Sequence, residues 1–265
     1  MKEIDVSGIG KINFKILNPG GNKTALVHGI DYSSKQKSII NNSIMEKFPD
    51  VEQVGFISDK ETRLEMAGGE FCLNASRCAI YEYSKNGNVV KLKVSGMDKT
   101  IIGKTIGKNE VELMIDISKD RNKLMKRKDK YWSINIDGIL IVVVNDADEY
   151  IKKLKQDESK AKQEIKQLMM EEFNTKEKAI GMMFLENEPN GIKINPVVWV
   201  KDIDTTFYET ACGSGSLGTA IYNYYINGED SINIIQPSGY SINIKLNTFG
   251  QTINSAQIRG IVEEK

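Results

Sequence analysis

Short runs in which apolar and polar positions alternate recur along the chain. Glycine, asparagine, aspartate and serine residues separate them, which is typical of half-buried strands joined by turns. This pattern predicts strands at 12–17, 25–28, 53–57, 63–66, 90–94, 111–115, 139–144, 179–185, 192–201, 232–236 and 241–246. In 148–173 the apolar residues instead recur at helical spacing among lysines and glutamates, which predicts one amphipathic helix. The pattern as a whole predicts an α+β fold with a mostly antiparallel sheet.

A long internal repeat divides the chain. Residues 70–83 read E-F-C-L-N-A-S-R-C-A-I-Y-E-Y, and residues 209–224 read E-T-A-C-G-S-G-S-L-G-T-A-I-Y-N-Y. A Ser-Gly pair follows each block, at 95–96 and again at 238–239. A repeat this long indicates a duplicated domain and not a solenoid. We therefore predict two similar lobes, with Cys72 in residues 1–118 and Cys212 in residues 119–255. A C-terminal strand at about 256–265 is expected to return to the first lobe.

Composition excludes several classes of protein. The 265 residues carry a formal net charge of zero, which argues against a protein built to hold nucleic acid. The longest apolar run, 139–144, is too short to span a bilayer, and the N-terminal residues lack an apolar signal core. Three cysteines and one histidine argue against a disulfide framework, a Cys/His zinc site and a Ser-His-Asp hydrolase. We expect a cytoplasmic protein that binds neither membranes nor metals.

Cys72 and Cys212 both lie where a loop is expected to enter a helix. Small polar residues follow each cysteine, as they do near helix N-termini, and apolar residues at helical spacing come next. The free N–H groups and the dipole of a helix N-terminus favour a thiolate and can bind a carboxylate. Two such ends facing each other are expected to hold one α-carboxylate and to place a sulfur on each side of the adjacent Cα. That arrangement suits racemisation, with one sulfur as base and the other as acid.

The two cysteine blocks resemble a known superfamily. C-L-N-A-S-R-C at 72–78 is similar to the C-G-N-G-A-R-C of diaminopimelate epimerases, and A-C-G-S-G at 211–215 is similar to their second signature. The chain resembles the cofactor-independent histidine racemases of that superfamily further. The segments that carry this likeness are N-P-G-G-N at 18–22, E-Q-V-G-F-I at 52–57, E-F-C-L-N-A at 70–75, K-V-S-G at 93–96, G-M-M at 181–183 and Q-P-S-G at 236–239.

This resemblance implies a fold, a mechanism and a set of site residues. The implied fold has two pseudo-symmetric lobes, each a strongly bent, mostly antiparallel sheet around a central helix. The implied chemistry needs no pyridoxal phosphate and no metal, with Cys72 and Cys212 as the catalytic acid/base pair. The substrate-binding residues that it implies are Asn22, Gln53, Leu73, Asn74, Gly213 and Ser214, and Glu209 is a candidate partner of the α-ammonium group.

Departures from the epimerase pattern indicate which substrate to expect. Two glycines of the first motif are Leu73 and Ala75 here, and residues 204–210 lack the arginine of an E-R pair. The groups that grip the distal end of diaminopimelate are therefore missing. We expect an isomerase acting on a small-molecule amino acid with one α-centre, with histidine favoured by resemblance. A diaminopimelate epimerase, a racemase of another amino acid, a non-catalytic amino-acid-binding protein and a cysteine redox sensor stay open as alternatives, as does homodimerisation.

Overall fold

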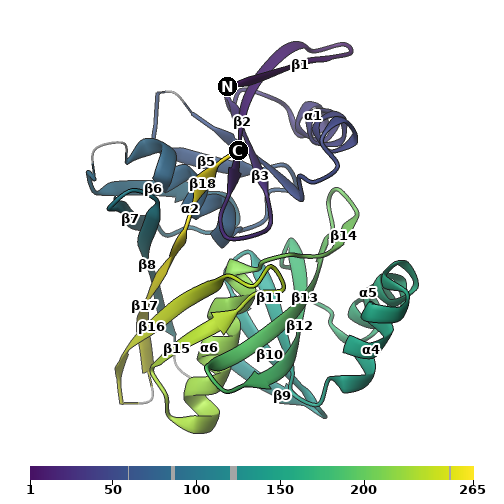
Figure 1. The fold of residues 1–265 in the computed structure, drawn as a ribbon, viewed down its shortest axis with the longest axis vertical. Coiled ribbons are helices and arrows are strands. Elements are labelled where there is room, and N and C mark those ends of the chain that lie inside the picture. Colours follow the sequence, from purple (N-terminus) through teal and green to yellow (C-terminus); the bar gives the residue numbers. More distant parts are fainter. Residues whose placement is uncertain (59, 85–86, 120–123, 251) are drawn as a thin grey trace.

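Strands dominate the fold and curve around two central helices (Figure 1). The computed structural model describes residues 1–58, 60–84, 87–119, 124–250 and 252–265. The helices are α1 (Ser34–Lys47), α2 (Leu73–Tyr83), α4 (Asp148–Gln156), α5 (Glu158–Glu172) and α6 (Gly213–Asn227). The strands are β1 (Lys2–Val6), β2 (Gly10–Asn18), β3 (Thr24–His28), β4 (Gln53–Ile57), β5 (Arg63–Met66), β6 (Val90–Val94), β7 (Ile101–Ile106), β8 (Glu110–Lys119), β9 (Met125–Lys128), β10 (Tyr131–Ile136), β11 (Ile139–Val144), β12 (Ala179–Glu188), β13 (Gly191–Val200), β14 (Thr205–Tyr208), β15 (Ser231–Ile235), β16 (Ser241–Phe249), β17 (Thr252–Ile261) and β18 (Glu263–Glu264).

The strand pairing runs through the same sequence of steps twice. From β2 to β8, successive neighbours pair antiparallel, parallel, antiparallel, parallel, antiparallel and antiparallel. The series β10, β11, β12, β13, β15, β16 and β17 repeats that order. Helices supply the parallel crossovers at matching places, with α1 matching α4 and α5, and α2 matching α6. The predicted α+β fold with two pseudo-symmetric halves is therefore confirmed.

Helices α2 and α6 form the centre of the molecule, each packed inside its own set of strands (Figure 1). Helix α2 packs against β3 and β5–β8, and α6 against β10–β13, β15 and β16. Most residues of both helices are buried, and the two helices contact each other. A helix that is buried nearly all round is held by packing on every side, so its first residues are fixed in place.

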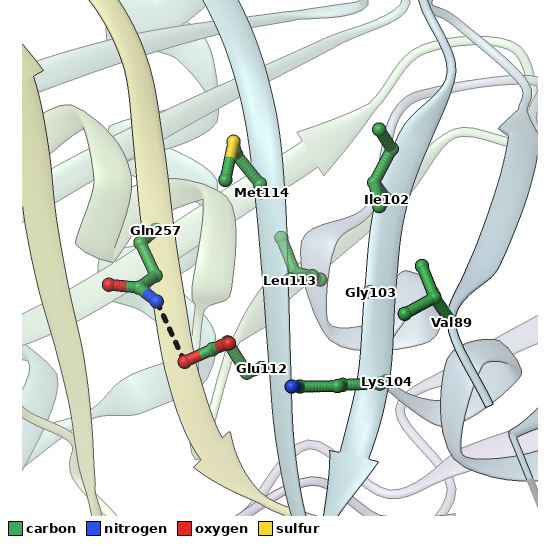
Figure 2. A pocket seen from close by; sticks show the side chains of 8 residues that line it. All are labelled: Val89, Ile102, Gly103, Lys104, Glu112, Leu113, Met114 and Gln257. Atoms are coloured by element: carbon green, nitrogen blue, oxygen red, sulfur yellow. Dashed lines mark hydrogen bonds between the residues drawn. The ribbon is translucent and has the colours of Figure 1, made fainter. Parts of the chain in front are cut away.

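The last strands of the chain join the two sets of strands. Strand β17 pairs antiparallel with β8, and β18 pairs with the end of β2. On the face shown in Figure 2, the Gln257 side chain of β17 donates a hydrogen bond of 2.7 Å to Glu112 of β8. Residues 120–123 lie next to the proposed lobe boundary and are outside the described residues. The division at 118/119 stays a proposal.

The pattern was wrong about one long helix. Residues 148–173 form two helices, α4 and α5, because Asp157 interrupts them and its side chain accepts a hydrogen bond of 3.0 Å from the Lys160 N–H. Aspartate is a favoured residue at such a cap, so it starts a second helix. The strands that the pattern did not predict include β1, β7, β9, β10 and β14. None of the helices among the described residues is long and apolar enough to cross a membrane.

Candidate active site

Both cysteines are the capping residues at the start of the central helices. Cys72 precedes α2 and Cys212 precedes α6, each with an extended backbone. The Ala75 N–H donates to the Cys72 Sγ at 3.4 Å, and the Gly215 N–H donates to the Cys212 Sγ at 3.3 Å. The predicted loop-to-helix junctions are confirmed. Each sulfur therefore lies at the positive end of a helix dipole.

The two thiols line one small cavity. Its described lining is formed by Gln53, Glu70, Phe71, Cys72, Asn74, Ile139, Ala179, Val198, Val200, Glu209, Cys212, Gly213 and Ser214. The volume is about 30 Å³, which is room for a few water molecules and far less than a small-molecule site usually offers. The structure thus places both sulfurs on a common space, as opposed acid and base groups require. It also shows that space almost closed.

The immediate neighbours of the two sulfurs differ. The Cys72 thiol donates a hydrogen bond of 2.9 Å to the Gln53 Oε1, and the Gln53 amide in turn donates to Thr24 at 2.7 Å. The Cys212 thiol interacts instead with the carboxyl group of Glu209. One sulfur therefore faces a neutral amide and the other faces a group that can gain or lose a proton.

Burial decides the protonation of the thiols in this ligand-free structure. Burial raises the pKa of Cys72 well above its ordinary value, although the Ala75 N–H opposes the shift. Burial likewise raises the pKa of Cys212, and the Glu209 carboxyl adds to the effect. The sequence led us to expect that the helix ends lower these pKa values. In this structure desolvation outweighs that influence, so both groups are neutral thiols near pH 7.

The two helix N-termini touch where a substrate carboxylate is expected. A Cβ on Gly213 would lie 2.8 Å from the Asn74 Oδ1, so only glycine allows this close approach. The Asn74 amide donates to the Ala211 carbonyl at 2.9 Å, and the Leu73 N–H donates to the Ser214 Oγ at 3.3 Å. Asn74, Gly213 and Ser214 line the cavity. Leu73 is not among its described lining residues, since its side chain is in the core and its N–H is already bonded.

A buried arginine fixes this junction. Arg77 is fully buried in α2, and its guanidinium donates to the Asn74 Oδ1 at 2.7 Å and to the Pro19 carbonyl at 2.8 Å. Burial lowers the Arg77 pKa to about 10, so the group still carries its charge at neutral pH. A charged donor on the Asn74 oxygen orients that amide so that its N–H group points at Ala211.

Asn22 lies behind the cavity wall. It has a left-handed backbone, with φ of 51°, and its side chain donates to the Glu52 Oε2 at 3.3 Å. Its side chain also hydrogen-bonds Glu209 and holds down the pKa of that carboxyl, against a larger effect of burial. Asn22 is not one of the described lining residues, so the structure brings it to Glu209 and not to the cavity itself.

Glu70 is a cavity residue that the sequence analysis did not select. It is only 7% exposed, and its Oε2 accepts no hydrogen bond from any described residue. Burial raises the Glu70 pKa to about 7 and the Glu209 pKa to about 8. The position of Glu70, two residues before Cys72, was the available signal. The apolar wall of Ile139, Ala179, Val198 and Val200 gave none, because those residues are distant in sequence.

A second hollow lies over β7, β8 and β17 (Figure 2). It has a volume of about 140 Å³, and its described lining includes neither cysteine. Val89, Ile102 and Met114 are exposed there beside Lys104 and Glu112. The larger hollow therefore lacks the pair of thiols that the smaller one holds.

Comparison with known proteins supports a racemase lineage. Residues 11–264 match the family model described as "Histidine racemase CntK N-terminal domain". A histidine racemase of Fusobacterium nucleatum is 28% identical over 243 residues, covering 86% of this chain and 87% of its own. A histidine racemase of Staphylococcus aureus is 24% identical over 242 residues, covering 86% of each chain.

Solved structures show a shared fold at lower identity. A hydroxyproline epimerase from Agrobacterium vitis, solved with trans-4-hydroxy-L-proline, superposes with a TM-score of 0.59 at 11% identity, covering 96% of this chain and 90% of its own. A phenazine biosynthesis protein of the PhzF family from Enterococcus faecalis gives a TM-score of 0.55 at 11% identity, covering 96% of each chain.

Proposed function

The chain belongs to the histidine racemase family whose model describes the CntK N-terminal domain, and from that premise we propose that it interconverts L- and D-histidine with Cys72 and Cys212 as its two bases. One observation carries the mechanism: two thiols, each capping the first turn of a central helix, line a common cavity. The mechanism needs no pyridoxal phosphate and no metal. It does need reduced cysteines, which the cytoplasm maintains.

The reaction consists of two proton transfers on opposite faces of the substrate Cα. A thiolate removes the Cα proton, so that the C–H bond breaks, an S–H bond forms and the electron pair delocalises into the substrate carboxylate. The opposite thiol then gives its proton to the other face of Cα and becomes the thiolate. The sulfurs have exchanged roles, and the reverse reaction uses the same steps in the opposite order.

The helix ends stabilise the charge that develops on the substrate carboxylate. We assign that carboxylate to the junction of α2 and α6, near Asn74, Gly213 and Ser214. Backbone N–H groups and the dipoles of two helices favour an anion there, and more strongly as the carbanion forms. Leu73 and Asn22 act from behind this junction, through Ser214 and Glu209 respectively.

Binding of the substrate ammonium group favours the thiolate form of a catalytic cysteine. We assign the ammonium to Glu209, whose buried carboxyl lies beside Cys212. A positive charge at that point favours the ionised forms of both the Glu209 carboxyl and the neighbouring thiol, so it lowers their pKa values. Substrate binding thus supplies the condition that the ligand-free cavity lacks.

The molecule has to open for each turnover. The cavity of about 30 Å³ holds about two water molecules, so it has to widen before substrate enters, and we assign that widening to a separation of residues 1–118 from residues 119–255. Hydrogen bonds between the halves, such as Asn74 to Ala211 and Ser238 to Gly20, then form again as the site closes. Closure keeps water away from the carbanion.

The test is isotope exchange at Cα. Incubation with L-histidine in D2O is expected to give D-histidine carrying deuterium at Cα, measured by chiral chromatography and mass spectrometry. The matched control is Cys78→Ala, which removes a buried thiol outside the cavity and is expected to keep exchange. If the unmodified protein puts no deuterium into histidine, the proposed function is wrong. If an amino acid other than histidine exchanges faster, the substrate assignment is wrong.

A further inference from the structure

Resting on the racemase function proposed above, we propose that Glu70 recognises the side chain of the substrate, with its Oε2 accepting a hydrogen bond from the imidazole ring. The first observation is an unsatisfied acceptor. Glu70 is one of the lining residues of the cavity, and its buried Oε2 accepts no hydrogen bond within the described part of the chain. The N–H groups of Glu70 and Gly68 hold down the pKa of its carboxyl group against the larger effect of burial. A buried carboxylate oxygen without a donor is costly, so a ligand that brings an N–H group to it binds favourably.

The second observation is the surface around that oxygen. A Cβ on Gly68 would lie 2.7 Å from the Glu70 Oε2 and 2.5 Å from the Val200 Cγ1, so the carboxylate and the aliphatic side chain border the same space. Phe71, Val198 and Ile139 extend the apolar surface. A flat ring with apolar faces and an N–H edge matches an apolar wall with one acceptor beside it.

The third observation concerns the distribution of charge. Glu209 interacts with Cys212 and Asn22. We have assigned it to the substrate ammonium group, so a different group is needed to bind the ring. Glu70 is a second buried carboxyl in the same cavity; its charge raises the pKa of Glu209, and both carboxyls raise the pKa of Cys72. Histidine carries an ammonium group and a side chain that takes a proton near pH 6.5. The ammonium group and the imidazole ring of the substrate are thus paired with the two carboxyls of the cavity. The substrate carboxylate is paired with the helix ends.

The fourth observation is that the backbone of Glu70 is fixed. The Ser95 Oγ donates to the Glu70 carbonyl at 2.8 Å and accepts from the Met66 N–H at 2.9 Å. In the other half of the molecule, the Ser238 N–H donates to the carbonyl of Thr210 at 3.0 Å, also two residues before its cysteine. The equivalent position therefore holds a carboxylate in one half and a hydroxyl in the other, and the Thr210 hydroxyl is already bonded to the Asn22 N–H and to Glu52.

The experiment separates ring recognition from recognition of the amino group. Glu70→Gln keeps the shape of the side chain, and Glu61→Gln removes an exposed carboxylate of the same half as a control. Two competitive ligands are titrated by calorimetry: imidazolepropionate, which has the ring and carboxylate but no ammonium, and L-2-aminobutyrate, which has the ammonium but no ring. Histidine exchange in D2O is measured in parallel, and KM and kcat are determined separately for each variant.

Glu70→Gln is expected to weaken imidazolepropionate binding and raise the KM for histidine by about tenfold or more, as for loss of one charge-assisted hydrogen bond. It is expected to change 2-aminobutyrate binding by less than about twofold. Equal weakening of both ligands, or of neither, overturns the proposal. Glu70→Asp, which keeps the charge and shortens the reach, provides a second variant if Glu70→Gln does not fold. Ligand binding is measured without turnover, so absence of histidine exchange in the unmodified protein is a separate result that overturns the racemase function alone.

Discussion

Cys72 and Cys212 occupy equivalent places in the two halves but have different surroundings. Each caps a central helix and accepts one N–H bond from the first turn. Cys72 donates a hydrogen bond to the oxygen of the neutral Gln53 amide, whereas Cys212 lies against the ionisable Glu209. The residue after each cysteine differs too, with Leu73 in the core and Gly213 pressed against Asn74. Duplication thus preserved the backbone of the site, while its side chains diverged around an asymmetric substrate.

Replacement of either sulfur tests whether the two halves are equally necessary. Cys72→Ser and Cys212→Ser are each expected to reduce racemisation by about 10³-fold or more, because a serine hydroxyl is a far weaker acid than a thiol and is almost never ionised to the base form near pH 7. The measurement is deuterium incorporation starting from L-histidine and, separately, from D-histidine. A variant that keeps near-normal racemisation in both directions contradicts the two-base mechanism.

The residues that follow the cysteines offer the next contrast. Gly213→Ala places a Cβ within 3.0 Å of both Asn74 and Leu73, so the helix ends must separate, and we expect about a 100-fold fall in kcat/KM. Leu73→Ala leaves a cavity in the core and is expected to cost about 2–5 kcal/mol of unfolding free energy, while activity persists below its lower melting temperature. Denaturant unfolding and exchange rates measured on both variants distinguish the effects. Comparable activity loss in both refutes the special role of the glycine.

The two buried carboxyls make ligand-free stability depend on pH. Burial raises the pKa of Glu70 to about 7 and of Glu209 to about 8, so the folded protein retains protons that the unfolded chain has released. Stability is therefore expected to fall as pH rises from 5 to 8, with Glu70 alone contributing on the order of 3 kcal/mol.

Thermal unfolding of Glu70→Gln and Glu209→Gln between pH 5 and 8 checks this linkage. Each variant is expected to be less sensitive to alkaline pH than the unmodified protein, because an amide does not titrate. Glu61→Gln, on the exposed surface, is expected to keep the full pH dependence. A parallel pH profile in all four proteins contradicts the assignment.

The smallest effect on rate is expected from a substitution that gives Cys72 a carboxyl neighbour, as Cys212 already has. Gln53→Glu places a carboxylate next to the Cys72 thiol, which raises the thiol pKa further because a negative charge disfavours the thiolate. We expect about a tenfold loss of rate at pH 7 and a shift of the kcat/KM profile to higher pH. Gln257→Glu, on the face shown in Figure 2, is the control for added charge and is expected to leave the profile unchanged. An unshifted profile in Gln53→Glu argues that this contact does not persist in the active form.

The sequence predicted the local and repeated features of the molecule well. It predicted poorly those features that are built from residues far apart in the sequence. Strands such as β4, β5 and β11 were predicted to the residue, because each is an apolar run between clear turn signals. The cysteines were found because a local motif occurs twice. Strand β14 is half-buried along its length and has no alternation to detect. The dominance of burial over the helix dipole at the thiols depends on residues from β4, β12 and β13, and no local pattern predicts that environment.

The pairing of β17 with β8 and of β18 with β2 has a consequence for folding of the nascent chain. Arg77, in the helix that Cys72 caps, donates to the Ile261 carbonyl at 3.3 Å, and Val262 is fully buried. The N-terminal half of the molecule is thus missing an integral strand until residues 252–264 have left the ribosome. Nascent chains stalled before that point are expected to remain protease-sensitive around α2, even though its own sequence emerged long before.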